Sequence, residues 1–167
     1  MKRPKPDPRL ILDAWRRLSP LPFGIGKKLF SRFVGAMAPY TGTIGATVLE
    51  LAPGFAQVQL RDRRRVRNHL SSIHAVALMN LGELVTGVAM MSALPPGSRG
   101  IVTDLAMTYL KKARGTLLAE ARVDPPQSAG KHDLQVVGSI RDAAGDLVAQ
   151  ARATWRVDIP QNEGRGR

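Results

Sequence analysis

The 167-residue sequence contains no cysteine. This absence excludes disulfides, thiolate metal sites and cysteine nucleophiles together, and it gives no sign of an oxidising compartment, so a cytoplasmic location is the default expectation. Common catalytic signatures are also missing: the sequence has no GxSxG elbow, no Walker phosphate loop, no GxGxxG turn and no zinc-ligand spacing. We therefore expect neither a metal site nor an organic cofactor.

Aromatic residues make up only 5% of the chain, and long hydrophobic runs are absent. The most apolar stretch, residues 84–94, has about half of the roughly 20 residues that a bilayer span requires. Asp7 and Asp13 follow the basic N-terminal residues and interrupt the apolar run that a signal peptide needs. We predict a protein without a membrane span.

Acidic residues are few relative to basic ones, with 13 Asp and Glu against 25 Lys and Arg, for a net charge of +12. Most of the excess lies in residues 1–39 and 61–67, whereas residues 125–159 carry equal numbers of each sign. A basic chain suggests nucleic acid or an anionic surface as partner. Because no set of stacking aromatics accompanies the arginines, we do not expect nucleic-acid binding. Solvated surface charge remains an alternative.

Residues 1–40 are predicted to form an extended arm and two amphipathic helices, the first from Asp7 or Pro8 to Leu18 and the second at 27–37, ended by Pro39. The second helix carries an apolar set beside basic residues: Leu29, Phe30, Phe33 and Met37 with Lys27, Lys28 and Arg32. This face either lies on a membrane surface or packs on the domain's own sheet.

From residue 43 the hydrophobic period changes from helical to alternating. A hairpin is predicted first, then an apolar helix from about residue 72 to 93 with Ser71 or Ser72 as N-cap, then four strands. The predicted strands are 43–51, 55–60, 101–110, 116–123, 132–141 and 147–157. A helix that is apolar on nearly all sides must be covered. We therefore predict an α+β domain at 41–159, an antiparallel sheet wrapped around one long central helix, followed by a disordered tail at 160–167.

Glu83 lies in the middle of the predicted central helix, among leucines and valines. Burying an ionised carboxylate there is unfavourable unless it meets solvent or a partner. One interpretation is that Asn80, Glu83 and Thr86 form the solvated stripe of the helix. The other is that Glu83 faces a cleft as nucleophile or general base, with a raised pKa.

His74 precedes Glu83 by nine residues, which places the two side chains half a turn out of phase on a regular helix. His74 is therefore expected to end the preceding loop, leaving the Ala75 and Val76 amides unpaired at the helix start, where such amides can stabilise an oxyanion. His69 and His74 lack nearby acidic residues and make only a weak case for metal binding.

Two motifs together resemble a known family. The first is Asn68-x5-His74-x8-Glu83 at the entrance of the long helix, and the second joins the strand 100–105 to a basic, glycine-ended exit, Tyr109-Leu110-Lys111-Lys112-Ala113-Arg114-Gly115. They resemble the hotdog-fold thioesterases, especially the phenylacetate-pathway and glutamate-using 4-hydroxybenzoyl-CoA branches, and are closest to an uncharacterised bacterial branch. The similarity covers about residues 41–158, so the fold it implies is the hotdog fold with an N-terminal helical extension.

The resemblance implies a role for each matching residue. Glu83 matches the catalytic carboxylate, Asn68 the asparagine that positions thioester or water, and Ala75, after His74, the glycine whose amide serves as oxyanion donor. Here Ala75-Val76 replaces the family's Gly-Gly, which leaves less room for the acyl group. Thr103 would reach the site from a neighbouring chain. Arg67, Lys111, Lys112 and Arg114 are candidate contacts for the phosphates of coenzyme A. The alternative for Lys111, Lys112 and Arg114 is a solvated cluster at the end of the strand.

The implied activity is hydrolysis of an acyl-CoA thioester by a dimer or a dimer of dimers. The alternative is a non-catalytic hotdog protein that binds acyl-CoA or a fatty-acyl group and associates with a membrane surface.

Overall fold

The computed structural model of the chain describes residues 7–161 except 125 and 127. Residues 1–6 of the predicted arm, Pro125 of the predicted loop, and residues 162–167 of the predicted tail lie outside the described residues. The described elements begin with helices, continue with a two-stranded hairpin and one long helix, and end with four strands, in the order that the sequence predicts.

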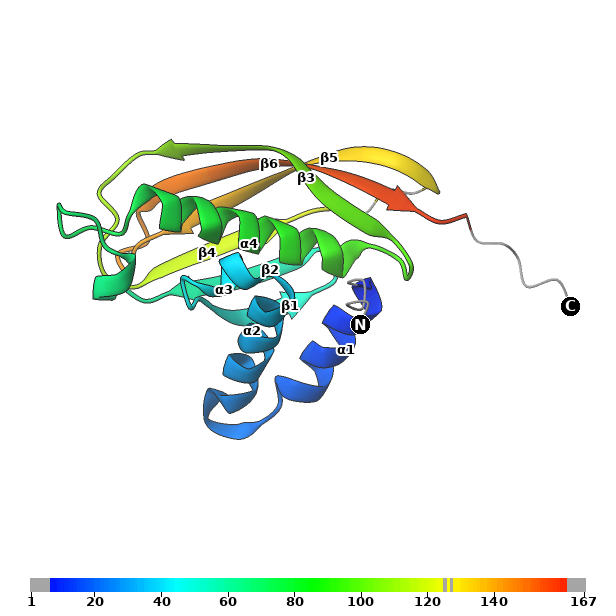
Figure 1. Ribbon diagram of the computed structural model, residues 1–167, viewed down its shortest axis with the longest axis horizontal. Helices are drawn as coiled ribbons and strands as arrows, with labels where there is room; N and C mark the ends of the chain where they lie inside the picture. The colour runs from blue at the N-terminus through cyan, green and yellow to red at the C-terminus, as the bar shows by residue number, and fades with distance from the viewer. Residues whose placement is uncertain (1–6, 125, 127, 162–167) are drawn as a thin grey trace, which may run out of the picture.

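Six antiparallel strands form one sheet in the order β1-β2-β4-β5-β6-β3. Their bounds are β1 Thr47–Ala52, β2 Phe55–Leu60, β3 Arg99–Tyr109, β4 Leu117–Arg122, β5 Gly130–Arg141 and β6 Leu147–Ile159. The long helix α4, Ala75–Ala93, lies across one face of this sheet (Figure 1). The predicted hotdog fold is confirmed, and the sheet leaves β1 and β3 as its two edge strands.

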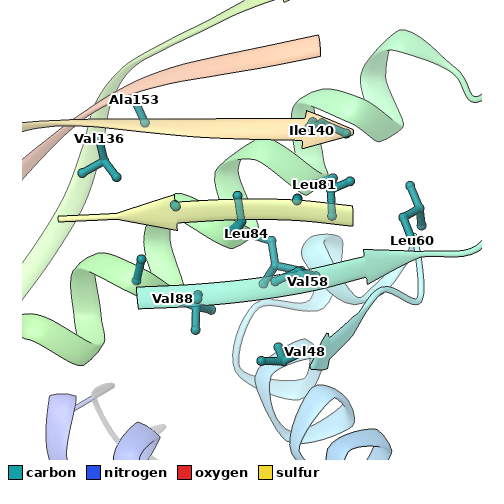
Figure 2. Packing of buried hydrophobic residues seen from close by; sticks show 14 of the residues in the cluster. Val48, Val58, Leu60, Leu81, Leu84, Val88, Val136, Ile140 and Ala153 are labelled. Carbon is teal, nitrogen blue, oxygen red and sulfur yellow. The ribbon is translucent and has the colours of Figure 1, made fainter. Parts of the chain in front are cut away.

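Small residues allow α4 to lie close to the sheet. A Cβ added at Gly82 would come within 2.5 Å of the Ala151 side chain on β6, and one added at Gly87 would lie 3.0 Å from Trp155. Along β6 the buried residues alternate with exposed ones as the sequence predicts, so one face of the strand contacts the helix. Figure 2 shows Leu81, Leu84 and Val88 of α4 packed among aliphatic side chains from β1, β2 and β5.

The N-terminal extension consists of α1 Pro8–Leu18, the short 3-10 helix η1 Pro22–Gly24, α2 Ile25–Met37 and α3 Pro39–Gly42. Asp7 caps α1 by accepting from the Arg9 amide. Phe30 of α2 is fully buried and meets Trp15 of α1 edge to face, with ring centroids 5.1 Å apart. Phe33 packs partly against the core, whereas Leu29 and Met37 are exposed. The predicted apolar face of α2 is therefore divided between the core and solvent.

The start of the first predicted strand is wrong. The second helix does end before Pro39, as predicted, but the short helix α3 follows it, and β1 begins at Thr47 rather than at Thr43. The cause is long-range: the Arg63 guanidinium donates to the carbonyls of Ile44 and Gly45 at 2.9 and 2.8 Å, and Gly45 adopts a positive φ of 58°. These carbonyls are thereby withdrawn from a regular strand.

The helix start predicted near residue 72, with Ser71 or Ser72 as N-cap, is wrong, whereas the prediction that His74 ends the preceding loop is confirmed. The helix begins at Ala75 with His74 as N-cap, and neither Ser71 nor Ser72 serves as cap. The Ser72 amide and hydroxyl both donate to the side-chain oxygen of Asn68, at 3.2 Å each, and Ser71 has a φ of 56°. The two serines therefore belong to a turn closed by Asn68 instead of the first turn of α4.

Candidate active site

The first turn of α4 carries the predicted oxyanion site. His74 accepts a hydrogen bond from the Val76 amide through Nδ1 at 3.1 Å, so a neutral His74 carries its proton on Nε2. The expectation that both amides are unpaired is therefore wrong for Val76, because its own cap satisfies it. For Ala75 no acceptor is recorded among the described residues, and Ala75 is exposed. The exposed Ala75 amide at the positive end of the helix thus remains for a ligand.

Alanine fits this position without backbone strain. The described non-glycine residues with positive φ are Phe23 and Ser71, so Ala75 does not need the left-handed conformation in which glycine is favoured. Val76 adds a half-exposed side chain at the helix start. The Ala75-Val76 pair therefore preserves the amide and narrows the space above it.

Asn68 holds the loop that leads into α4. Its side-chain oxygen accepts from the Leu70 amide at 2.9 Å as well as from Ser72, and its backbone amide donates to the Ser72 carbonyl at 2.8 Å. The Ile73 amide donates to the Ala113 carbonyl at 2.8 Å, which ties this loop to the segment after β3. The oxygen of Asn68 is thus used within the loop, and its side-chain NH₂ is the group left for a ligand.

Asp62 joins the arginine run to the same region. Its two oxygens accept from Arg67 Nε at 2.6 Å and from the Gly115 amide at 3.0 Å. The hydrogen bond from Arg67 holds the pKa of Asp62 below its ordinary value, against the opposing effect of burial. Arg67 therefore lies beside the predicted site, but one of its donors is already occupied.

The basic segment between β3 and β4 lies near the start of α4, and its members differ in their contacts. Lys111 donates to Asp142 at 2.8 Å and to Asp146 at 2.6 Å, and these bonds raise its pKa to about 12. Arg114 points to the Leu70 carbonyl at 3.5 Å, and Lys112 is exposed. Lys111 thus stabilises the β5–β6 hairpin, whereas Lys112 and Arg114 remain available to an anion.

Glu83 is half-buried in the third turn of α4, and burial raises the pKa of its carboxyl. Among the described residues, no cation lies within ion-pair distance of it. The interpretation of Asn80, Glu83 and Thr86 as a solvated stripe is wrong. Asn80 is buried and donates to the Tyr40 carbonyl at 3.1 Å, while buried Thr86 donates to the Gly82 and Glu83 carbonyls and accepts from Trp155 at 3.3 Å.

The side of α4 that carries Glu83 also carries Met90, seven residues later, and it lies next to the edge strand β3. A Cβ added at Gly82 would meet Met107 of β3 at 2.9 Å, and one added at Gly100 of β3 would meet Met90 at 2.6 Å. Thr103 lies on β3 at an irregularity between Val102 and Asp104, and its hydroxyl donates to the Thr154 carbonyl at 3.2 Å. Among the described residues, Thr103 and Glu83 of one chain therefore share no hydrogen bond.

Tyr109 is a residue of this region whose role the sequence did not predict. Its hydroxyl, at the end of β3, donates to the Ala75 carbonyl at 3.2 Å, and burial raises its pKa. Tyr109 belongs to the motif at the exit of the strand, so the sequence draws attention to it. The spacing of that motif does not predict a hydrogen bond to the start of α4, 34 residues earlier.

Within the described residues, no group of three or more His, Asp or Glu side chains could hold a metal ion. By length and composition α4 could cross a membrane, but 67% of its most apolar window is buried inside the domain. Its apolar character is thus explained by the sheet that covers it.

Comparison with known proteins places this geometry in a family. Residues 26–157 match the family model described as a domain of unknown function, DUF4442. The chain belongs to this family. It is also 30% identical over 122 residues to a candidate esterase from Halobacterium salinarum, a match that covers 68% of this chain and 81% of the esterase. Ester hydrolysis has thus been ascribed to one relative of this chain.

Solved structures with the same fold extend this relationship. A structural-genomics protein called APC5556 is 30% identical, with a TM-score of 0.76 over 90% of this chain and 99% of its own. A thioesterase from Haemophilus influenzae is 16% identical, with a TM-score of 0.63 over 75% and 87% of the two chains. A phenylacetic acid degradation-related protein from Ralstonia eutropha is 23% identical, with a TM-score of 0.61 over 71% and 89%. This DUF4442 protein therefore shares the hotdog fold of the thioesterases.

Proposed function

We propose that this protein hydrolyses a thioester of the acyl-CoA type, with Glu83 as its catalytic carboxylate. The observation that carries the proposal is a half-buried glutamate on the central helix that has no cationic partner among residues 7–161 as far as the structure describes them, and whose burial raises the carboxyl pKa. A carboxylate with a purely structural role at such a place would be stabilised by an ion pair. A general base, by contrast, works best when its pKa is close to neutrality. The esterase relative and the thioesterases of the same fold support the reaction class.

The chemistry needs a base or nucleophile and an oxyanion donor. In the simpler route, Glu83 takes a proton from water, the water oxygen bonds to the thioester carbon, and the carbon–sulfur bond breaks. The departing thiolate receives the proton, which gives a carboxylic acid and a free thiol. The Ala75 amide, at the positive end of α4, is the donor proposed for the oxyanion. In the other route Glu83 attacks the carbon itself and a mixed anhydride is hydrolysed.

A second copy of the chain is proposed to complete the site. Ala75 and Glu83 of one chain are separated by roughly 12 Å along the helix axis, given 1.5 Å per residue, so they cannot both contact one thioester carbonyl. The Glu83 of one protomer is therefore proposed to act together with the Ala75 amide of the other. The edge strand β3 has eleven residues, and Ile101 on it is 65% exposed, so the strand offers a long unpaired edge. Pairing of two such edges would place a second copy beside the side of α4 that carries Glu83. The partner's Thr103 would then reach Glu83.

Lys112 and Arg114 are proposed to contact the phosphates of the coenzyme, with Arg67 contributing the donors that Asp62 leaves unused. Lys111 is not included among the proposed phosphate contacts, because two carboxylates already bind its ammonium group. The coenzyme is then bound near the start of α4 of one protomer, and the acyl group extends toward the β3 edge.

Release of free thiol from a panel of aliphatic and aromatic acyl-CoA esters tests the proposal. We expect turnover by the native chain and a loss of about 10²- to 10⁴-fold with Glu83→Gln, the range for removal of a general base. Glu50→Gln, at an exposed position on β1, is the matched control and should turn over as the native chain does. Absence of turnover on every ester would refute the enzyme and favour an acyl-binding protein. Turnover that survives Glu83→Gln would refute the site.

A further inference from the structure

The turn between α1 and α2 exposes large apolar side chains. It lies far from the sheet, at the end of the helical hairpin (Figure 1). Phe23 is 93% exposed and has a φ of 57°, a left-handed conformation that bulky residues seldom adopt. Leu21 and Ile25 on either side of it are also exposed. A strained, solvent-facing phenylalanine contributes nothing to the core of this domain, so its apolar ring is available to something outside it.

The solvent-facing side of α2 continues this apolar turn and adds positive charge. Phe30 and Val34 anchor the opposite side of the helix in the core. Lys28, Leu29 and Arg32, together with Ile25, follow one another at helical spacing on the exposed side. This face is therefore apolar and basic at once, as in helices that lie in the plane of a membrane interface.

A groove of about 900 Å³ runs between α2 and the edge strand β1 and begins at Phe23. Its basic lining residues are Lys27, Lys28, Arg32, Arg61 and Arg63, and none of the described residues that line it is acidic. The Ser31 hydroxyl accepts from the Val48 amide of β1 at 2.8 Å, so the floor of the groove is fixed to the sheet.

The positive charges of this groove lie close to one another. Burial lowers the pKa of Arg63, and the neighbouring charges of Arg65 and Arg61 lower it further. Arg63 is held by the carbonyls of Ile44 and Gly45, so it cannot turn away from these neighbours without losing those bonds. Such a cluster is complementary to a densely anionic surface.

We propose that this face, which we call the basic groove face, docks on an anionic lipid bilayer. Leu21, Phe23 and Ile25 enter the interfacial layer, and the lysines and arginines of α2 and the groove lie at the level of the lipid phosphates. The exposed apolar turn favours a bilayer over nucleic acid, for which the basic side chains alone would suffice. The face lies at the β1 edge, opposite the β3 edge, so the proposal does not depend on thioester hydrolysis.

Sedimentation of the full chain with vesicles tests the proposal. One vesicle population contains equal parts of phosphatidylcholine and phosphatidylglycerol, and the other contains phosphatidylcholine alone. We expect the chain to sediment with the anionic vesicles and to be released at high salt, because counter-ions screen the basic side chains. Phe23→Asn should lower the partition coefficient about tenfold, through loss of one buried aromatic side chain. Double replacement Lys28→Glu with Arg32→Glu should abolish sedimentation.

Two measurements separate docking from folding. Asparagine tolerates a left-handed φ, so Phe23→Asn should melt at or above the temperature of the native chain. Val137→Asn, which replaces an exposed apolar side chain on β5, should sediment as the native chain does. Failure of the native chain to sediment with anionic vesicles would overturn the proposal. So would equal sedimentation of native chain and Phe23→Asn, DNA retention without vesicle binding, or a change of oligomeric state as the sole effect of Phe23→Asn.

Discussion

The start of α4 and the basic groove face are both rich in lysine and arginine, but they use these residues differently. Around α4, Arg67 is paired with Asp62, and Lys111 with Asp142 and Asp146. In the groove, none of the described lining residues is a carboxylate. The net charge of +12 therefore comes from basic side chains that no carboxylate neutralises, and those of the groove are left for an external anion.

The same contrast separates the two edges of the sheet. At β1 the Val48 amide is occupied by Ser31 and a helical hairpin covers the flank. At β3 the strand pairs only with β6, and the described residues beyond it provide no further strand. An edge of this length that remains open favours pairing with another chain, so we propose self-association at β3 and surface binding on the β1 side.

The largest expected effect comes from blocking the β3 edge. Ile101→Lys introduces a charge on an exposed edge strand, which opposes edge-to-edge pairing. We expect the dimer to dissociate in light scattering after size exclusion, and the hydrolysis rate to fall about a hundredfold, because a displaced partner no longer orients the substrate. Leu29→Lys, at the other side of the molecule, should keep both the assembly and the rate. A fully active monomer would show that one chain holds the whole site.

A smaller effect, on the free energy of unfolding, is expected when the carboxylate of Asp62 is removed from its two hydrogen-bond donors. Asp62→Ala leaves the Gly115 amide and Arg67 without their acceptor, and we expect the free energy of unfolding to fall by about 1 to 2 kcal/mol. The neighbouring change Arg61→Gln in the groove should alter it by less than about 0.5 kcal/mol, as at most surface positions. Urea denaturation of the two variants measures the difference, and equal losses would contradict the contrast between paired and available charge.

The pH dependence of the Asp62 contribution follows from its lowered pKa. A carboxyl whose pKa is lower in the folded state stabilises the fold above its unfolded pKa, and this stability is lost as the pH falls through the folded value. The difference between the native chain and Asp62→Ala should therefore shrink in acid below the ordinary range of aspartate. A difference that grows in acid would contradict the ion pair.

The smallest effect concerns stability at Glu83. Because burial raises its pKa, the protonated form is favoured in the folded chain, and this contribution is lost as the pH rises through the folded value. Glu83→Gln should then raise the melting temperature slightly at neutral pH, with the gain vanishing near pH 4, where the native carboxyl is protonated. A lower melting temperature of Glu83→Gln at neutral pH would indicate a structural role instead.

The long elements could be predicted because their signal is local. The alternation in β6 and the apolar run of α4 extend over many residues. The hydrophobic period therefore predicts which side chains are buried without knowledge of distant contacts. The end of α4 follows from Pro95-Pro96-Gly97, which cannot continue a helix. Glu83 could be singled out because a carboxylate among leucines conflicts with that local pattern.

The remaining features depend on partners far along the chain. Asn80 and Thr86 look solvent-facing by spacing, but both are buried, and their partners Tyr40 and Trp155 are 40 and 69 residues away. The Asn80 side-chain NH₂ donates to the Tyr40 carbonyl, while its Oδ1 has no partner among the described residues. Lys111 looks like a free phosphate ligand until the β5–β6 hairpin brings two aspartates to it. The division of the arginine run between Arg67 at the site and Arg63 in the groove likewise needs the folded chain.

The most direct test of the central claim is the pH–rate profile of thioester hydrolysis for the native chain and Glu83→Gln. If the Glu83 carboxylate acts as base or nucleophile, kcat/KM of the native chain rises with pH through a pKa above the ordinary value of glutamate. Glu83→Gln should then be slower by about 10²-fold or more and lack that rise. The same rising limb in both proteins would contradict the assignment of the reaction to Glu83.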